Sequence, residues 1–165
     1  MQKGYIRGPV VRIARVGIGV AIRKGGRRPD ISSSDAFRRA LLDASSISYA
    51  SQSASGIHFA KIIERLQVAD VVKAKSRIAA GGAEAVIGPV ARGDVELGIS
   101  AMPDILATPG AEVLGPLPTE LQDYVVFTAG VGVSATEPAA AKTLIDFLVA
   151  PASAVVIKRS GLEPW

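Results

Sequence analysis

The chain has 165 residues, no cysteine, one histidine and a formal net charge of +4. This length suffices for one ordinary domain core, and the absence of cysteine excludes disulfide frameworks, thiolate metal sites and cysteine nucleophiles. A single histidine without cysteine cannot supply a typical zinc or iron site, so we expect no metal centre.

Much of the excess positive charge lies in the first 28 residues, from Arg7 to Arg28. Apolar residues interrupt these charges and aromatic residues are scarce, which favours a solvated edge over a nucleic-acid partner. The start lacks the apolar core and cleavage site of a secretory signal peptide. No stretch is long and uncharged enough to span a bilayer, so we expect no membrane insertion.

Strands and helices alternate through the first hundred residues. Residues 16–22 form an uncharged β-rich run, typical of a buried strand, which Lys24-Gly25-Gly26 ends. A helix follows over 36–44, capped by Ser33 or Ser34. The pattern then repeats, with strands over 46–50, 76–80 and 95–100 and helices over 57–66 and 83–92. Strands separated by single helices predict an α/β fold with a mainly parallel sheet flanked by helices.

The pattern changes after Pro103. Proline and glycine residues crowd into 108–118, which we interpret as a link. Beyond it, residues 124–134 predict a long apolar strand, and helices are expected over 138–149 and from Pro151 to Gly161.

Two loops could bind a ligand. In a parallel sheet, the loops after the strands meet at one edge, where helix N-termini present free N–H groups to an anion. Ser51–Gly56 offers hydroxyl donors there, and Gly81–Glu84 lets the backbone approach a ligand closely. Neither loop has the spacing of a phosphate-binding P-loop.

No motif supports catalysis or a cofactor. Residues 130–135 match Gly-x-Gly-x-x-Ala, but they lie inside an apolar run without the acidic residue that a dinucleotide site needs, so we expect a strand there. His58 lies near Ser53 and Ser55, but the sequence identifies neither an orienting acid nor an oxyanion arrangement. A surface or capping histidine is the simpler interpretation, and we expect a protein that is not an enzyme.

An ordered series of short segments resembles the bacterial periplasmic molybdate-binding proteins and their relatives, the type II solute-binding proteins of ABC transporters. The segments are Gly17–Gly25, Pro29–Ser32, Ala36–Leu42, Ser55–Lys61, Glu64–Leu66, Gly98–Ser100, Leu114–Gln122 and Gly161–Pro164. The resemblance implies a periplasmic substrate-binding component that works with an ABC permease. In this family two α/β lobes close around a small oxyanion held by neutral donors.

The resemblance also implies the ligand-binding residues. Ala54, Ser55 and Gly56 correspond to an amide-donating helix start, with Ala83 near the next contact; the expected set is Ser53, Ala54, Ser55, Gly56, Gly82 and Ala83. A tyrosine of some molybdate binders is Ala101 here, so the expected ligand is a molybdate-like oxyanion and not molybdate specifically.

The resemblance further implies an incomplete second lobe. Residues 1–104 would form one α/β domain with the hinge strands, and 105–165 would be the C-terminal segment of the lobe whose other strands are missing. The apolar faces of this truncated lobe would need cover, so we expect a homo-oligomer or a domain-swapped dimer. Two alternatives stay open: a ligand-sensing domain related to LysR-type regulators, and a remnant that binds nothing.

Overall fold

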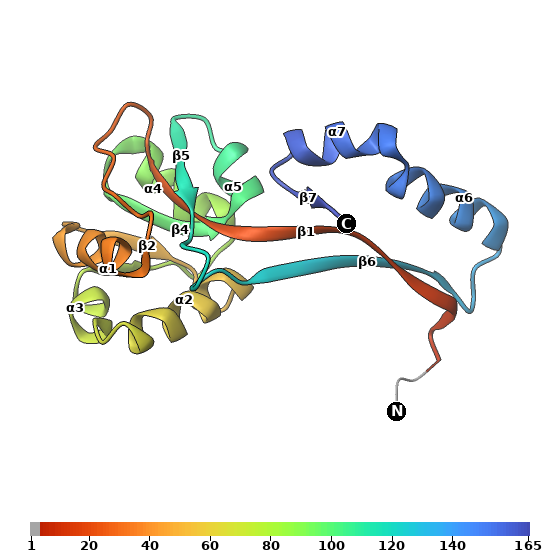
Figure 1. Cartoon of the computed structure of the whole chain (residues 1–165), viewed down its shortest axis with the longest axis horizontal. Coiled ribbons are helices and arrows are strands. Elements are labelled where there is room, and N and C mark those ends of the chain that lie inside the picture. Colours follow the sequence, from red (N-terminus) through yellow and green to blue (C-terminus); the bar gives the residue numbers. More distant parts are fainter. Residues whose placement is uncertain (1–3) are drawn as a thin grey trace. The chain divides into compact units, whose positions relative to one another are not determined.

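The computed structural model describes residues 4–165, whose strands and helices fall into two units (Figure 1). The larger unit is Gly17–Tyr124, and the smaller unit combines the described residues up to Val16 with Val125–Trp165. Strand β1 (Ile6–Arg23) contributes to both units. The larger unit therefore extends beyond residue 104, where the sequence placed its boundary.

The sheet of the larger unit has the strand order β3-β2-β4-β1-β5. Strand β2 (Ile47–Tyr49) pairs in parallel with β3 (Ser76–Ile78) and β4 (Leu97–Ala101). Strand β1 pairs antiparallel with β4 and with β5 (Ala111–Pro116). The α/β class is confirmed, but the sheet is mixed and not mainly parallel, because periodicity locates strands without giving the direction in which they pair.

Strand β5 corrects the interpretation of residues 108–118 as a link. It forms the edge of the sheet against β1, where Gly19 is opposite Pro116. An edge strand tolerates proline because the missing N–H group then leaves no central ladder bond unmade. Turn-forming residues therefore obscured a short strand that completes the larger unit.

Helices cover both faces of this sheet. One face carries α1 (Ser34–Asp43), α2 (Ala54–Arg65) and α3 (Ala69–Ala74), and the other carries α4 (Ala83–Arg92) and α5 (Met102–Leu106) (Figure 1). The first face buries a large core, led by Phe37, Leu41, Phe59, Ile63 and Val72. The second face buries a smaller core around Val86, Ile87, Val90 and Ile105. The helices predicted over 36–44, 57–66 and 83–92 are confirmed as α1, α2 and α4.

Ser48 is the central residue of β2, and its fully buried hydroxyl has no hydrogen-bond partner among residues 4–165. A buried polar group without a partner destabilises a fold, so Ser48→Ala is expected to raise the free energy of unfolding by up to about 1 kcal/mol. Ser100→Ala is the matched control, because Ser100 Oγ donates to Asp104 Oδ2 at 2.6 Å and its loss should lower stability by about 1–2 kcal/mol. Urea unfolding followed by far-UV circular dichroism measures both, and equal losses would contradict the expectation.

The smaller unit contains β6 (Tyr124–Gly132) except its first residue, α6 (Pro138–Val149), α7 (Pro151–Arg159) and β7 (Glu163–Pro164). Both strands pair with β1. These elements confirm the predicted strand over most of 124–134 and the two predicted helices, each with proline in its first turn. The glycines of the Gly-x-Gly-x-x-Ala match lie at the end of β6, as expected for a strand.

Two side-chain contacts attach the C-terminus to β1 within the smaller unit. Arg15 forms an ion pair with Glu163 at 2.6 Å, and the guanidinium of Arg12 lies 4.5 Å from the ring centroid of Trp165.

Among the described residues, no single helix is both long and apolar enough for a membrane span. Helices α6 and α7, bent by 68°, pass that test as a pair on length and composition.

Candidate functional site

The two loops singled out in the sequence border one hollow of the larger unit. Its volume is about 370 Å³, and it is lined by residues 50–53 after β2 and 78–81 at the end of β3. The loops meet because β2 and β3 are parallel neighbours, so both chains leave the sheet at the same edge. Ser53 lines the hollow directly, while Gly82 and Ala83 follow the lining residue Gly81 in the chain.

Ser53 is the N-cap of α2, and its hydroxyl is fully used inside the loop. Ser53 Oγ donates to the carbonyl oxygen of Ala50 at 2.9 Å and accepts from the N–H of Gly56 at 3.0 Å. The hydroxyl oxygens of Ser55 and Ser53 lie 3.1 Å apart. Because Ser53 already donates its one hydroxyl proton to Ala50, Ser55 is the donor in this hydrogen bond and Ser53 the acceptor. Both hydroxyl protons are therefore committed to the loop itself.

The first backbone N–H groups of α2 remain available. No helix provides acceptors for its first four N–H groups, and here Gly56 bonds to the Ser53 side chain and Ile57 to the Ser53 carbonyl. Within residues 4–165, the N–H groups of Ala54 and Ser55 have no hydrogen-bond acceptor. These two amides are the donors that this loop can offer to a ligand.

Gly56 allows α2 to begin directly against the end of β2. A Cβ atom at this position would lie 1.8 Å from the carbonyl oxygen of Ala50 and 2.6 Å from its carbonyl carbon. No side chain fits in this space, and the obstacle is backbone. Gly56 therefore fixes where the free amides of Ala54 and Ser55 lie relative to the sheet.

The second loop presents a helix start without a side-chain cap. Gly82 is the N-cap of α4, and the N–H of Ala85 bonds to its carbonyl at 3.0 Å. In the described part of the chain, the N–H groups of Ala83 and Glu84 have no acceptor. The Glu84 carboxylate lies over Gly88, one turn further along the helix, since Oε1 is 2.4 Å from where a Gly88 Cβ would be. Its negative charge is thus directed along α4 and away from the free amides.

The electrostatics of the hollow favour a small anion. The residues that line it are uncharged: Ala50, Ser51, Gln52, Ser53, Ile78, Ala79, Ala80 and Gly81. Helix α2 begins directly after the lining residue Ser53, and α4 begins two residues after the lining residue Gly81. Each helix start has a positive dipole end and two N–H groups without an acceptor among residues 4–165. Neutral donors of this kind suit an oxyanion or a carboxylate, whose oxygens only accept hydrogen bonds.

His58, in the first turns of α2, contacts a different segment. Its Nε2 lies 2.7 Å from the carbonyl oxygen of Leu121, and its Nδ1 lies 3.4 Å from the Asp123 carboxylate. The sequence did not identify this acid because Asp123 is far from His58 along the chain. The ring holds residues 121–123 against α2, and neither Ser53 nor Ser55 is hydrogen-bonded to it.

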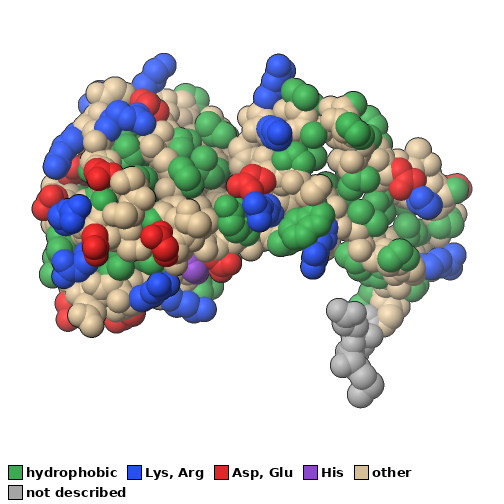
Figure 2. All heavy atoms as spheres, viewed as in Figure 1, with side chains coloured by type: hydrophobic (Ala, Val, Ile, Leu, Met, Phe, Trp, Pro, Cys, Tyr) green, Lys and Arg blue, Asp and Glu red, His purple; other side chains and the backbone are tan. Residues whose placement is uncertain are grey.

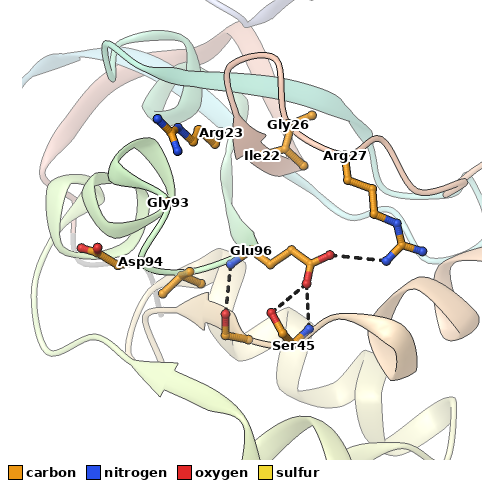
Figure 3. A pocket seen from close by; sticks show the side chains of 10 residues that line it. Ile22, Arg23, Gly26, Arg27, Ser45, Gly93, Asp94 and Glu96 are labelled. Carbon is orange, nitrogen blue, oxygen red and sulfur yellow. Dashed lines mark hydrogen bonds and ion pairs between the residues drawn. The ribbon is translucent and has the colours of Figure 1, made fainter.

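A second hollow, of about 340 Å³, lies at the opposite ends of β2 and β4 (Figure 3). There Glu96 accepts hydrogen bonds from the N–H and hydroxyl of Ser45, at 2.7 and 2.8 Å, and lies 3.6 Å from Arg27. Charges of both signs line this hollow, and its central carboxylate is already bonded. It therefore stabilises the start of β4 and is a poorer anion site than the first hollow.

An α/β sheet with two helix starts beside one uncharged hollow is suited to binding a small ligand. The chain belongs to the family of bacterial extracellular solute-binding proteins, whose model matches residues 1–163. This finding confirms the predicted relationship to the solute-binding proteins at the level of the family.

One relative of this chain carries the name of an enzyme. The chain is 34% identical over 170 residues to an aconitate isomerase from Pseudomonas sp., an alignment covering 99% of this chain and 64% of that relative. The chain thus spans less than two thirds of that relative's length.

Two solved structures share the fold. The substrate-binding domain of a putative molybdenum ABC transporter from Clostridium difficile aligns with a TM-score of 0.78 at 14% identity, over 93% of this chain and 66% of that one. The periplasmic molybdate-binding protein of Azotobacter vinelandii aligns with a TM-score of 0.69 at 18% identity, over 96% and 70%. At these identities the likeness concerns the fold alone.

Proposed function

We propose that this chain is the substrate-binding component of a periplasmic ABC importer and that it binds a small anion in the hollow after β2 and β3. The observation that carries the proposal is the pair of helix starts, α2 and α4, which border one uncharged hollow with unbonded N–H groups. The proposed ligand-binding set is the one expected from the sequence, with the N–H groups of Ala54, Ser55 and Ala83 as donors, and Glu84 is added.

Molybdate-like oxyanions fit this donor set. Backbone amides hold such an ion without a counter-charge, because each N–H bond to an ionised oxygen is stronger than a bond between neutral groups. The names of the two solved structures of this fold support the same ligand class. The first candidates are therefore molybdate, tungstate, sulfate and phosphate.

A carboxylate is the second candidate, and the 34% identity to an aconitate isomerase favours it. Carboxylate oxygens accept from the same amides, so cis- and trans-aconitate could take the place of an oxyanion. Isomerisation would also require a group that moves a proton beside the bound acid, and the side chains lining the hollow do not titrate. We therefore propose binding without turnover for either ligand class.

The test is isothermal titration calorimetry with the four oxyanions and the two aconitates. Saturable heat with one oxyanion supports the first candidate, and saturable heat with an aconitate alone supports the second. The absence of heat with all six would refute anion binding by this chain. Incubation with cis-aconitate followed by chromatography tests turnover separately, and formation of the trans isomer would contradict binding without turnover.

Replacing Ala54 by proline removes one proposed donor with little effect on the fold. Ala54 is the first residue of α2, where proline is favoured, and the preceding Ser53 has the extended backbone (φ −80°, ψ 157°) that proline requires. Ala54→Pro is expected to weaken ligand binding roughly 10- to 100-fold, as expected for losing one hydrogen bond to an ion. The dissociation constant from calorimetry measures this effect.

Ser34→Pro is the matched control for Ala54→Pro. Ser34 is the first residue of α1, follows an equally extended Ser33 (φ −140°, ψ 166°) and lies outside the hollow. Its affinity and melting temperature should equal those of the unmodified chain. Equal affinity of Ala54→Pro and Ser34→Pro would show that the Ala54 amide does not contact the ligand.

A further inference from the structure

Between residues 4 and 165 the chain crosses from one unit to the other twice. The first crossing, within β1, lies between Val16 and Gly17, and the second, within β6, lies between Tyr124 and Val125. A change in the relative position of two units has to be absorbed by a few backbone residues in the segments that connect them. Contacts between the residues beside these two crossings therefore decide how freely the connection bends.

Gln122 ties the two crossings together through its side chain. Its Oε1 accepts from the N–H of Ile18 at 2.9 Å, and its Nε2 donates to the carbonyl oxygen of Ile18 at 2.9 Å. Ile18 is the second residue after the first crossing, and Gln122 is the third residue before the second crossing. The amide exchanges two hydrogen bonds with Ile18, as a residue of a neighbouring antiparallel strand would.

The side chain takes this role where a backbone partner is missing. The pairing of β5 with β1 ends at Gly19 opposite Pro116, and β6 begins only at Tyr124. Ile18 lies in this gap, and the carbonyl of Ile18 also accepts from the N–H of Leu117 at 3.0 Å. The N–H of Ile18 has Gln122 as its acceptor, so the connection depends on this amide.

Gly17 leaves room for the amide beside the first crossing. A Cβ atom at this position would lie 3.2 Å from Nε2 of Gln122 and 3.3 Å from Cε1 of Tyr124. Both distances are shorter than the optimal van der Waals separation of about 3.5–4.0 Å. A side chain at position 17 would therefore push the Gln122 amide away from β1.

Helix α2 holds the backbone around Gln122 from the other side. His58 Nε2 lies 2.7 Å from the carbonyl oxygen of Leu121, and Arg65 donates to the carbonyl oxygen of Glu120 at 3.1 Å. The histidine ring, purple in Figure 2, also lies beside the Asp123 carboxylate. Leu121 is buried in the core as well. The backbone before the second crossing is thus fixed to α2, and the Gln122 amide fastens it to β1.

We propose that Gln122 is a positioning residue at a hinge between the two units. Its amide fastens β1 to the segment that enters β6, so the two crossings move together. Without the amide each crossing would bend independently, and the units would sample a wider range of relative positions. This inference concerns the connection between the units, and it holds whether or not the hollow binds an anion.

Spin labels on the two units measure this range in the absence of a ligand. The chain has no native cysteine, so Val71→Cys on α3 and Leu144→Cys on α6 place one label at an exposed position of each unit. Pulsed electron paramagnetic resonance then gives the distribution of distances between the labels. Gln122→Met has a side chain of similar length without either hydrogen bond, and it should widen the distribution roughly twofold.

Gln67→Met is the matched control for Gln122→Met. Gln67 is exposed, and its side chain has no hydrogen bond among residues 4–165, so the distribution should stay unchanged. Amide exchange of Ile18, followed by NMR, should be at least about tenfold faster in Gln122→Met because the acceptor is lost. Unchanged exchange of this amide would overturn the proposal, since the tie would then not exist.

Gly17→Ala disturbs the same tie without changing Gln122. It should also widen the distribution, whereas Gly82→Ala should not, because no atom lies within 4 Å of a Cβ at Gly82. Distributions of equal width in Gln122→Met, Gly17→Ala and the chain with native residues at both positions would overturn the proposal. A lower urea midpoint with an unchanged distribution would give Gln122 a role in stability alone and would overturn it too.

Discussion

Gly56→Ala is expected to lower the free energy of unfolding by about 3 kcal/mol and to weaken ligand binding at least about 100-fold. The added Cβ would lie 1.8 Å from the Ala50 carbonyl oxygen, so either β2 or the first turn of α2 must move. Any such movement shifts the amides of Ala54 and Ser55 relative to the neighbouring residues 50–53, which line the hollow. Urea unfolding and calorimetric titration of the same sample measure the two effects.

Gly82→Ala provides the control, because it adds the same methyl group at the N-cap of the other helix start. No atom lies within 4 Å of a Cβ there, and the backbone has an ordinary φ of −73°. We expect a stability change below about 1 kcal/mol, mainly from the preference for glycine over alanine at an N-cap. If Gly56→Ala were as stable as Gly82→Ala, the close approach of α2 to β2 would be refuted.

Phe59→Ala is expected to lower the free energy of unfolding of the larger unit by about 3–5 kcal/mol, as for other large-to-small changes in a core. Phe59 is fully buried on α2 and packs edge to face against Tyr49 of β2, with ring centroids 5.1 Å apart and planes at 67°. Its removal leaves a cavity between the helix that bears the site and the strand beneath it. The shift of the urea midpoint, followed by far-UV circular dichroism, gives the magnitude.

Ile57→Ala is the corresponding control on the same helix. Ile57 is 48% exposed, so truncating it removes few contacts and should change stability by less than about 1 kcal/mol. The near-UV signal of the buried Tyr49 should also weaken in Phe59→Ala and persist in Ile57→Ala. Similar losses in both variants would contradict the assignment of Phe59 to the core.

Local sequence patterns predicted the elements of the fold better than their arrangement. Apolar spacing and capping residues located α1, α2, α4, α6 and α7, because these features act over a few neighbouring residues. Strand direction depends on where the chain crosses the sheet, so the antiparallel pairing of β1 was missed. Helix α3 has only six residues, too few for a helical pattern to be recognised.

The candidate site was likewise predicted better in its position along the chain than in its hydrogen bonds. The position of the Ser/Gly loops after two strands predicted that they would meet, and the parallel pairing of β2 and β3 brings them to one hollow. Amide donors at the start of α2 were expected, but the sequence could not show that the Ser53 hydroxyl donates to Ala50 and is therefore not left for a ligand. Which donors remain is decided by hydrogen bonds across the loop, and these follow from the close contact of Gly56 with Ala50.

The tryptophan near the C-terminus makes the smaller unit observable by itself. Trp165 is the sole tryptophan of the chain, and its ring lies against Arg12 of β1 in that unit. Excitation at the red edge of the indole band therefore reports on this part of the molecule, while the absorbance of the three tyrosines is avoided. An emission shift that precedes the loss of helical signal in urea would show that the two units have separate stabilities.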